Sequence, residues 1–178
     1  MSANQAGVAT HHGEFEARLA EHRGILVKIA HAYAFDRSER DDLIQEICLQ
    51  LWRSYPSYDR ERRFSTWMYR VALNTAISWL RQAQLRLHHD SPLDAAAEMK
   101  AQNAPEPDER IEWVYRFLRT LPSLDRALLL LYLDDRSYRE IADVLGISDT
   151  NVGTKINRLK QLMRRELASE KETSRGTR

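Results

Sequence analysis

The chain has 178 residues, of which 30% are charged and 43% apolar, and its 27 basic and 26 acidic side chains nearly cancel. This length suits one large domain or two small ones, and the composition is typical of a globular protein in water. A membrane-spanning helix is excluded, because it needs roughly 20 consecutive apolar residues and the longest apolar run, Ala127–Leu133, has seven.

The N-terminal residues and the cysteine content indicate the compartment. The chain begins with polar residues and His11-His12 where a secretory signal would need an apolar core. Cys48 is the sole cysteine, which excludes an internal disulfide and fits a reducing environment. We therefore expect a cytoplasmic protein without membrane insertion.

The spacing of apolar residues predicts an all-α fold, because it is helical rather than alternating, and glycine and proline are scarce. Between residues 87 and 108 the pattern lapses into an acidic, proline-bearing segment that indicates a flexible linker. We expect two small helical domains, over residues 1–86 and 109–169, and a disordered tail over 170–178. Helices are predicted at residues 14–33, 40–55, 65–84, 109–120, 123–134, 137–145 and 149–169.

The predicted helix over residues 40–55 has two distinct stripes. Its core stripe consists of Ile44, Ile47, Cys48 and Leu51. The second stripe mixes charged, amide and large apolar side chains: Asp42, Gln45, Glu46, Leu49, Trp52 and Arg53. A solvated face rarely needs both Leu49 and Trp52, so this stripe predicts a surface that docks on another protein.

Aromatic and arginine side chains alternate through the following segment, residues 55–81. Aromatic rings beside arginines can stack on unpaired bases while the arginines hold phosphates. The alternative is that the rings belong to the core. We interpret Trp67 and Trp79 as core residues because they lie on a predicted helix, and Tyr58 and Phe64 as open to bases because they adjoin an irregular basic stretch.

Charge is unevenly distributed along the chain. No acid occurs between Arg62 and His89, or between Thr150 and Arg165, and each window carries five arginines or lysines. Two basic surfaces on a nearly neutral chain suggest two contacts with a polyanion. The alternative is that both windows form solvated helix faces.

The C-terminal half contains the pattern of a helix-turn-helix. Ser137 and Glu140 form a capping box, Gly146 supplies a turn, and Ser148 caps the next helix. The next helix buries one stripe and turns amides and bases outward, which suits a DNA major groove. Its buried stripe is Val152, Ile156, Leu159 and Met163, and its outward side chains are Asn151, Thr154, Lys155, Asn157, Arg158 and Gln161. Asn157 and Arg158 suit base edges, and Lys155, Lys160 and Arg164 suit phosphates. A pair of helices in an ordinary core is the alternative.

Two segments resemble a known family. Asp42-Leu43-Ile44-Gln45-Glu46, followed by FSTWMYRVALN at residues 64–74, resembles region 2 of bacterial sigma factors. The segment from Leu121-Pro122 through Tyr138-Arg139-Glu140-Ile141-Ala142 to Arg165 resembles their region 4. The order and spacing are similar to those of the extracytoplasmic-function (ECF) group of the sigma-70-like family, which keeps only these two domains joined by a linker.

The resemblance implies a sigma factor that directs promoter recognition, DNA melting and transcription initiation. The implied partners are promoter DNA, an anti-sigma factor, and core RNA polymerase through its beta-prime clamp helices and its beta subunit. The implied core-polymerase-binding residues are Asp42, Gln45, Glu46, Leu49 and Trp52. The residues expected at the minus-ten element are Tyr58, Arg62, Arg63, Phe64, Arg70, Asn74 and Arg81. Those expected at the minus-thirty-five element are Asn151, Thr154, Lys155, Asn157, Arg158 and Lys160.

The chain departs from the family pattern at two places. The paired tryptophans with which housekeeping sigma factors wedge the duplex correspond to Arg70 and Val71, so melting is expected to depend on capture of a flipped base. Gly153 stands where relatives often carry a basic residue, which removes one expected DNA contact and costs ~1 kcal/mol of helix stability against alanine.

Two other classes of function are alternatives. A helix-turn-helix regulator that acts without core polymerase would explain the C-terminal half but not the docking stripe. An enzyme would need catalytic groups, and the sequence has no paired carboxylates, activated nucleophile or phosphate-binding glycine loop. The histidine pairs His11-His12 and His88-His89 lie in segments expected to be flexible, so we expect no metal site. Because the catalytic motifs are missing, we also expect no cofactor and no catalytic residue.

Overall fold

A computed structural model describes the backbone of residues 3–89 and 108–176 and the side chains of residues 12–85 and 108–170. These parts contain α-helices, one 3-10 turn and no strand, so the prediction of an all-α fold is confirmed. The chain divides into two compact units, Met1–Glu106 and Pro107–Arg178. None of the described helices has the length and apolar content that a bilayer crossing requires.

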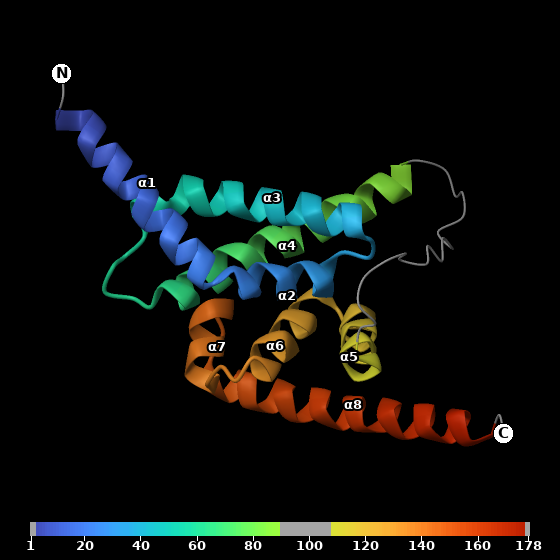
Figure 1. Cartoon of the computed structure of the whole chain (residues 1–178). Helices are drawn as coiled ribbons and strands as arrows, with labels where there is room; N and C mark the ends of the chain where they lie inside the picture. Colours follow the sequence, from blue (N-terminus) through green and yellow to red (C-terminus); the bar gives the residue numbers. More distant parts are fainter. Residues whose placement is uncertain (1–2, 90–107, 177–178) are drawn as a thin grey trace. The chain divides into compact units, whose positions relative to one another are not determined.

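The first unit is a bundle in which α2, α3 and α4 pack on one another (Figure 1). Its elements are α1 (Ala3–Glu21), α2 (Arg23–Tyr33), α3 (Arg37–Ser54), the 3-10 turn η1 (Tyr55–Ser57) and α4 (Phe64–His89). The fully buried side chains between these helices are Ile29, Tyr33, Leu43, Ile47, Leu51, Met68, Tyr69 and Leu73. Their spacing on each helix is that of one apolar face.

Three sequence predictions for this unit are corrected. The single helix expected over residues 14–33 is two helices, because the chain turns at His22 (φ −107°, ψ 13°). α3 begins earlier than expected, because the Asp36 side chain accepts a hydrogen bond from the Glu39 amide and caps the helix. Leu43 is fully buried on α3, whereas Ile44 and Cys48, placed in the predicted core stripe, are half-buried.

The second unit consists of α5 (Glu109–Thr120), α6 (Ser123–Leu133), α7 (Tyr138–Leu145) and α8 (Asp149–Gly176). Leu118, Leu128, Ile141 and Ile156, one from each helix, are buried together with their apolar neighbours. Asp108 caps α5 by accepting a hydrogen bond from the Arg110 amide at 3.0 Å.

The ends of α4 and α8 lie beyond their predicted positions. α4 continues to His89 and so enters the predicted linker, of which residues 90–107 lie outside the described residues. α8 continues to Gly176 rather than ending at Ser169, which corrects the expectation of a disordered tail from residue 170.

Candidate functional site

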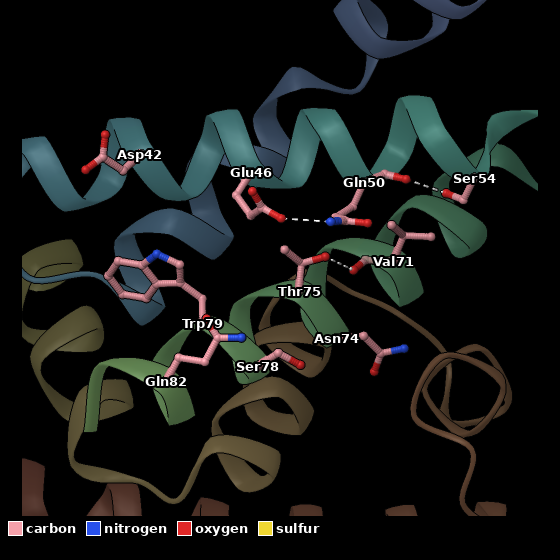
Figure 2. A pocket seen from close by; sticks show the side chains of 10 residues that line it. All are labelled: Asp42, Glu46, Gln50, Ser54, Val71, Asn74, Thr75, Ser78, Trp79 and Gln82. Carbon is pink, nitrogen blue, oxygen red and sulfur yellow. Dashed lines mark hydrogen bonds between the residues drawn. The ribbon is translucent and has the colours of Figure 1, made fainter. Parts of the chain in front are cut away.

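The predicted docking stripe borders a groove between α3 and α4. This α3–α4 groove has a volume of about 730 Å³, and Figure 2 shows the side chains along it. Its lining residues are Asp42, Glu46, Gln50 and Ser54 of α3 with Val71, Asn74, Thr75, Ser78, Trp79 and Gln82 of α4. The Gln50 amide donates to the Glu46 carboxylate at 2.8 Å. Both sides of the groove therefore carry amide and hydroxyl groups, and its two carboxylates lie on the α3 side.

The other members of the stripe do not line this groove. Gln45 and Leu49 are exposed on α3. Trp52 is 40% exposed and packs edge-on against two rings of α1, with centroid distances of 4.9 Å to His12 and 5.3 Å to Phe15. The acidic end of the stripe therefore faces α4 across the groove, and its aromatic end is supported by α1.

Six rings form an aromatic cluster where α1, the end of α3, η1 and the start of α4 meet: Phe15, Trp52, Tyr55, Tyr58, Phe64 and Trp67. Tyr58 and Phe64 are only 9% and 5% exposed, so the interpretation that their rings are open to bases is wrong. Trp67 and Trp79, interpreted as core residues, are both half-buried instead. The cluster buries Tyr58 and Phe64 because α1 packs against them, with the Arg18 guanidinium 5.9 Å and 5.7 Å from the centres of their rings.

The basic loop, residues 59–63, is held at both ends. The Tyr58 hydroxyl donates to the Arg62 carbonyl at 2.5 Å, and the Arg60 guanidinium pairs with Glu14 of α1 at 2.9 Å. Arg62 and Arg63 are exposed, and the Arg62 guanidinium lies 3.5 Å from the Asp59 carboxylate. The burial of Tyr58 thus fixes the loop that presents these two arginines.

The exposed face of α4 continues this basic surface. Arg70, Asn74 and Arg81 are all exposed, and their separations of four and seven residues place them on one side of a helix. Asn74 also lines the α3–α4 groove. Asn74 therefore belongs to the predicted minus-ten surface and also lines the groove that Asp42 and Glu46 of the predicted docking surface border.

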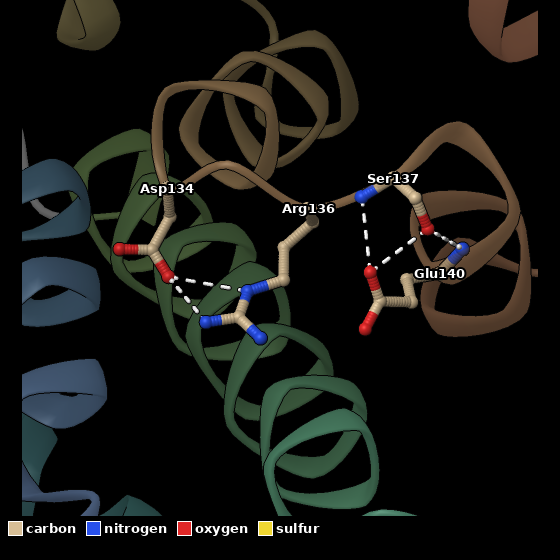
Figure 3. A network of polar contacts seen from close by, with 4 residues as sticks. All are labelled: Asp134, Arg136, Ser137 and Glu140. Carbon is tan, nitrogen blue, oxygen red and sulfur yellow. Dashed lines mark hydrogen bonds and ion pairs between the residues drawn. The ribbon is translucent and has the colours of Figure 1, made fainter.

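The predicted helix-turn-helix is confirmed in α7 and α8. Ser137 accepts a hydrogen bond from the Glu140 amide and the Glu140 carboxylate accepts one from the Ser137 amide, which forms the capping box in Figure 3. Gly146 ends α7 with φ 68°, a left-handed conformation that favours glycine. The Ser148 hydroxyl accepts a hydrogen bond from the Asn151 amide at 3.3 Å and caps α8.

The outward side of α8 carries the residues expected at the minus-thirty-five element. Asn151, Thr154, Asn157 and Arg158 are exposed, and Lys155 and Lys160 are half-buried. The Lys160 ammonium lies 5.4 Å from the centre of the Tyr132 ring, within cation–π range. A side chain added at Gly153 would place its Cβ 3.5 Å from the Tyr138 ring, so α7 and α8 approach closely there.

Sequence reasoning missed one residue of this surface, Asp125 in the first turn of α6. Its side chain is buried, yet its carboxylate lies 3.0 Å from the Lys155 ammonium and 2.9 Å from the Arg158 guanidinium. The signal in the sequence was an acid two residues before the apolar run at 127–133. A buried carboxylate needs a charged or hydrogen-bonding partner, so this position pointed to a basic partner elsewhere in the unit.

His12 is the member of the two histidine pairs whose side chain is described, and it lies 3.1 Å from Glu16. The side chains of His11, His88 and His89 lie outside the described residues. Within the described side chains, three or more potential metal ligands do not gather at any point.

Comparison with known proteins identifies both halves of the chain. Residues 19–86 match the family model for Sigma-70 region 2, and residues 111–163 match that for Sigma-70, region 4. The chain is 34% identical over 131 residues to the ECF RNA polymerase sigma-E factor of Escherichia coli, which covers 66% of each protein. It is 29% identical over 152 residues to the probable RNA polymerase sigma factor RfaY of Xanthomonas campestris, covering 82% of this chain and 38% of RfaY.

A solved structure shares the fold. The sigma factor RpoE of Bartonella quintana, crystallised with the anti-sigma factor NepR, superposes with a TM-score of 0.71 at 17% identity, over 87% of this chain and 97% of that one. The two family models match in the order region 2, region 4, and each match lies in one of the two helical units. The second unit ends in a helix-turn-helix. These findings agree on one family. The chain belongs to the sigma-70 family, in its ECF group, whose members bind core RNA polymerase and direct transcription initiation at promoters.

Proposed function

We propose that the two units of this sigma factor have different binding functions and that residues 87–108 form the linker between them. Residues 1–86 bind the polymerase and the minus-ten element, and residues 109–169 bind the minus-thirty-five element. The protein supplies no catalytic group of its own and works in the cytoplasm with the polymerase. The observation that carries the proposal is the pairing of an α3 docking surface with a basic α4 face in one unit and a helix-turn-helix in the other.

The docking surface consists of Asp42, Gln45, Glu46, Leu49 and Trp52. Three features support a protein partner. Leu49 and Trp52 are each 40% exposed, and large apolar side chains are typical of interface cores. The carboxylates of Asp42 and Glu46 lie in the same groove and would meet a basic partner favourably. We assign this surface to the clamp helices of the beta-prime subunit.

The minus-ten element is bound by the basic loop and the exposed face of α4. Arg62, Arg63, Arg70 and Arg81 hold the phosphates, and Asn74 contacts a flipped non-template base. The exposure of all five side chains supports this assignment. Binding of the flipped base offsets the unstacking cost of a few kcal/mol, so melting needs no ATP. Because Tyr58 and Phe64 are buried, we assign them the role of holding the loop rather than stacking on bases.

The minus-thirty-five element is read by α8. Asn151, Thr154, Asn157 and Arg158 face outward from a capped helix, which is the geometry of a recognition helix in a major groove. Lys155 and Lys160 add positive charge beside them. The beta subunit of the polymerase and an anti-sigma factor are further proposed partners. The anti-sigma assignment is supported by the fold shared with a sigma factor that was crystallised with one.

Transcription by core polymerase tests the proposal. Core enzyme with and without the purified chain is given the organism's upstream DNA fragments, and run-off products are mapped. We expect new, discrete start sites that appear with the chain. The competing function, a regulator that acts alone, predicts instead that the isolated chain binds duplex operator tightly and that core enzyme gains no start site.

A further inference from the structure

We propose that Asp125 is a positioning residue for promoter reading: it holds the Arg158 guanidinium and the Lys155 ammonium in place on α8 and thereby sets the base preference at the minus-thirty-five element. The inference rests on the proposed function of α8 as the reader of duplex DNA.

The Asp125 carboxylate bridges two basic side chains of the recognition helix α8. Its two carboxylate oxygens bind different partners, with Oδ1 accepting from Lys155 Nζ at 3.0 Å and Oδ2 from Arg158 Nη2 at 2.9 Å. The partners lie 30 and 33 residues later in the chain. Asp125 is 6% exposed and is followed by the buried residues of α6, so its carboxylate is fixed by the core.

The exposure of Arg158 argues for a role beyond stability. Its side chain is 71% exposed although its guanidinium is bound to a buried carboxylate. A guanidinium has five N–H donors, and the hydrogen bond to Asp125 uses one at Nη2. The remaining donors face solvent with a defined orientation, which suits the bidentate contact that arginine makes with a guanine edge.

The charges predict a specific pattern for a neutral residue at position 125. One carboxylate beside two cations leaves the cluster at +1, and its replacement by an amide leaves +2. The extra positive charge strengthens phosphate attraction, which is independent of sequence. The freed guanidinium loses its fixed orientation, which weakens the base contact. The Asp125→Asn variant is therefore expected to bind DNA more tightly and read it less selectively.

The experiment uses holoenzyme assembled from core polymerase and the full chain. A promoter found by run-off transcription is changed one base pair at a time through its minus-thirty-five element, and initiation is compared with binding to a duplex without a promoter. For Asp125→Asn we expect the preference at one or two base pairs to fall about tenfold, in line with the loss of one good base contact. Binding to the other duplex is expected to rise about twofold or more at low salt.

Matched variants separate positioning from charge and from folding. Asp143→Asn removes an exposed acid from α7 and is expected to keep the preference. Asp125→Glu keeps the carboxylate and is expected to retain most of the base preference. Arg158→Ala is expected to lose the same preference as Asp125→Asn, and the double variant to lose no more. If Asp125 served only to stabilise the fold, Asp125→Asn would lower both promoter recognition and binding to the duplex without a promoter.

Wild-type protein provides a readout that needs no variant. In nitrogen-detected NMR of the free chain, rotation of the Arg158 guanidinium is expected to be slower than that of Arg164, an exposed arginine on the same helix. Equal rotation would overturn the proposal, as would a folded Asp125→Asn variant with full base preference. If wild-type holoenzyme showed no minus-thirty-five preference, or Arg158→Ala kept it, the reader role of α8 would fail instead.

Discussion

Arg60 in the basic loop and Glu14 in α1 form an ion pair of 2.9 Å across 46 residues of sequence. Glu14 also binds Arg18 at 3.1 Å, and the Arg18 guanidinium lies 5.7 Å from the centre of the Phe64 ring. A helix that begins outside the region 2 match is thus attached to the loop that we assign to the minus-ten element.

We expect Glu14→Gln to loosen this loop without unfolding the protein. The pair is partly exposed, so its loss should change the free energy of unfolding by no more than about 1 kcal/mol. Hydrogen exchange of residues 59–63 should become faster, since their tether to α1 is gone. Glu16→Gln, which changes an exposed neighbour in the same helix, serves as the control. Unchanged exchange in Glu14→Gln would show that Arg60 does not hold the loop.

Reversal of charge in the α3–α4 groove should prevent assembly with core polymerase. Asp42→Arg and Glu46→Lys place a cation where a basic partner docks, and juxtaposed like charges cost several kcal/mol. We expect the affinity for core enzyme to fall at least a hundredfold, measured by fluorescence anisotropy, with an unchanged melting temperature. Asp41→Arg makes the same charge change on an exposed neighbour and should retain most of the affinity. Core binding by Asp42→Arg at wild-type strength would refute the docking assignment.

The parts of the molecule that the sequence predicted well depend on local signals. The capping box at Ser137 and Glu140 and the turn at Gly146 are set by residues within a few positions of each other, and all three have the predicted roles. The exposed stripe of α8 follows from helical spacing alone. Such features need no knowledge of distant contacts.

The errors arose where distant parts of the chain meet. Tyr58 and Phe64 adjoin arginines in the sequence, but α1 covers them, and no local pattern indicated that this helix packs on their rings. Asp125 binds residues of α8 that lie 30 and 33 positions away. Tertiary contacts of this kind override local composition, because burial is decided by the packing of whole helices.

Asn74 should matter more for DNA melting than for initial promoter binding. A base is available to its exposed amide only after it leaves the stack, so Asn74→Ala removes a contact that forms late. We expect open-complex formation, followed by permanganate footprinting, to fall about tenfold, the effect of losing one hydrogen bond of ~1.4 kcal/mol. Binding to a duplex promoter at low temperature should change less than twofold. Ser78→Ala, one turn further along the same groove, is the control, and equal losses at both steps would contradict the assignment.

The protein should lose stability at alkaline pH through Tyr55 and Cys48. Burial raises the pKa of the Tyr55 phenol, and the nearby Glu14 carboxylate raises this pKa further. Burial also raises the pKa of the Cys48 thiol. Both groups therefore keep their protons in the folded state at pH values where the unfolded chain has lost them. The free energy of unfolding is then fully maintained below about pH 8, where the unfolded thiol and phenol are still protonated, and falls as the pH rises through the folded pKa values.

Urea denaturation at pH 8 and pH 10.5 tests this dependence. Tyr55→Phe removes the phenol while keeping the ring in the aromatic cluster, so the loss of stability between the two pH values should become smaller. Cys48→Ser should reduce a separate part of the loss. A wild-type free energy of unfolding that stayed constant up to pH 10.5 would contradict the stated direction of both pKa shifts.

The two helix caps of the helix-turn-helix should differ in strength. Ser137 belongs to a reciprocal capping box, in which its hydroxyl also donates to the Glu140 carboxylate at 2.8 Å. Ser148 accepts a single, longer hydrogen bond of 3.3 Å from Asn151. Ser137→Ala is therefore expected to destabilise the unit by about 1–2 kcal/mol, and Ser148→Ala by about 0.5 kcal/mol.

Hydrogen exchange followed by mass spectrometry measures both effects. Exchange of the α7 amides reports on Ser137→Ala, and exchange of the α8 amides reports on Ser148→Ala. α7 has eight residues, too few to persist without its cap and its packing on α8. Fraying of α7 would leave Tyr138 without a fixed position beside Gly153 and would remove part of the packing that holds α8 in place. Ser137→Ala should thus weaken minus-thirty-five reading together with stability, whereas Asp125→Asn weakens reading while sequence-independent binding rises. Protection of α7 that did not change in Ser137→Ala would mean that packing on α8, rather than the cap, holds this helix.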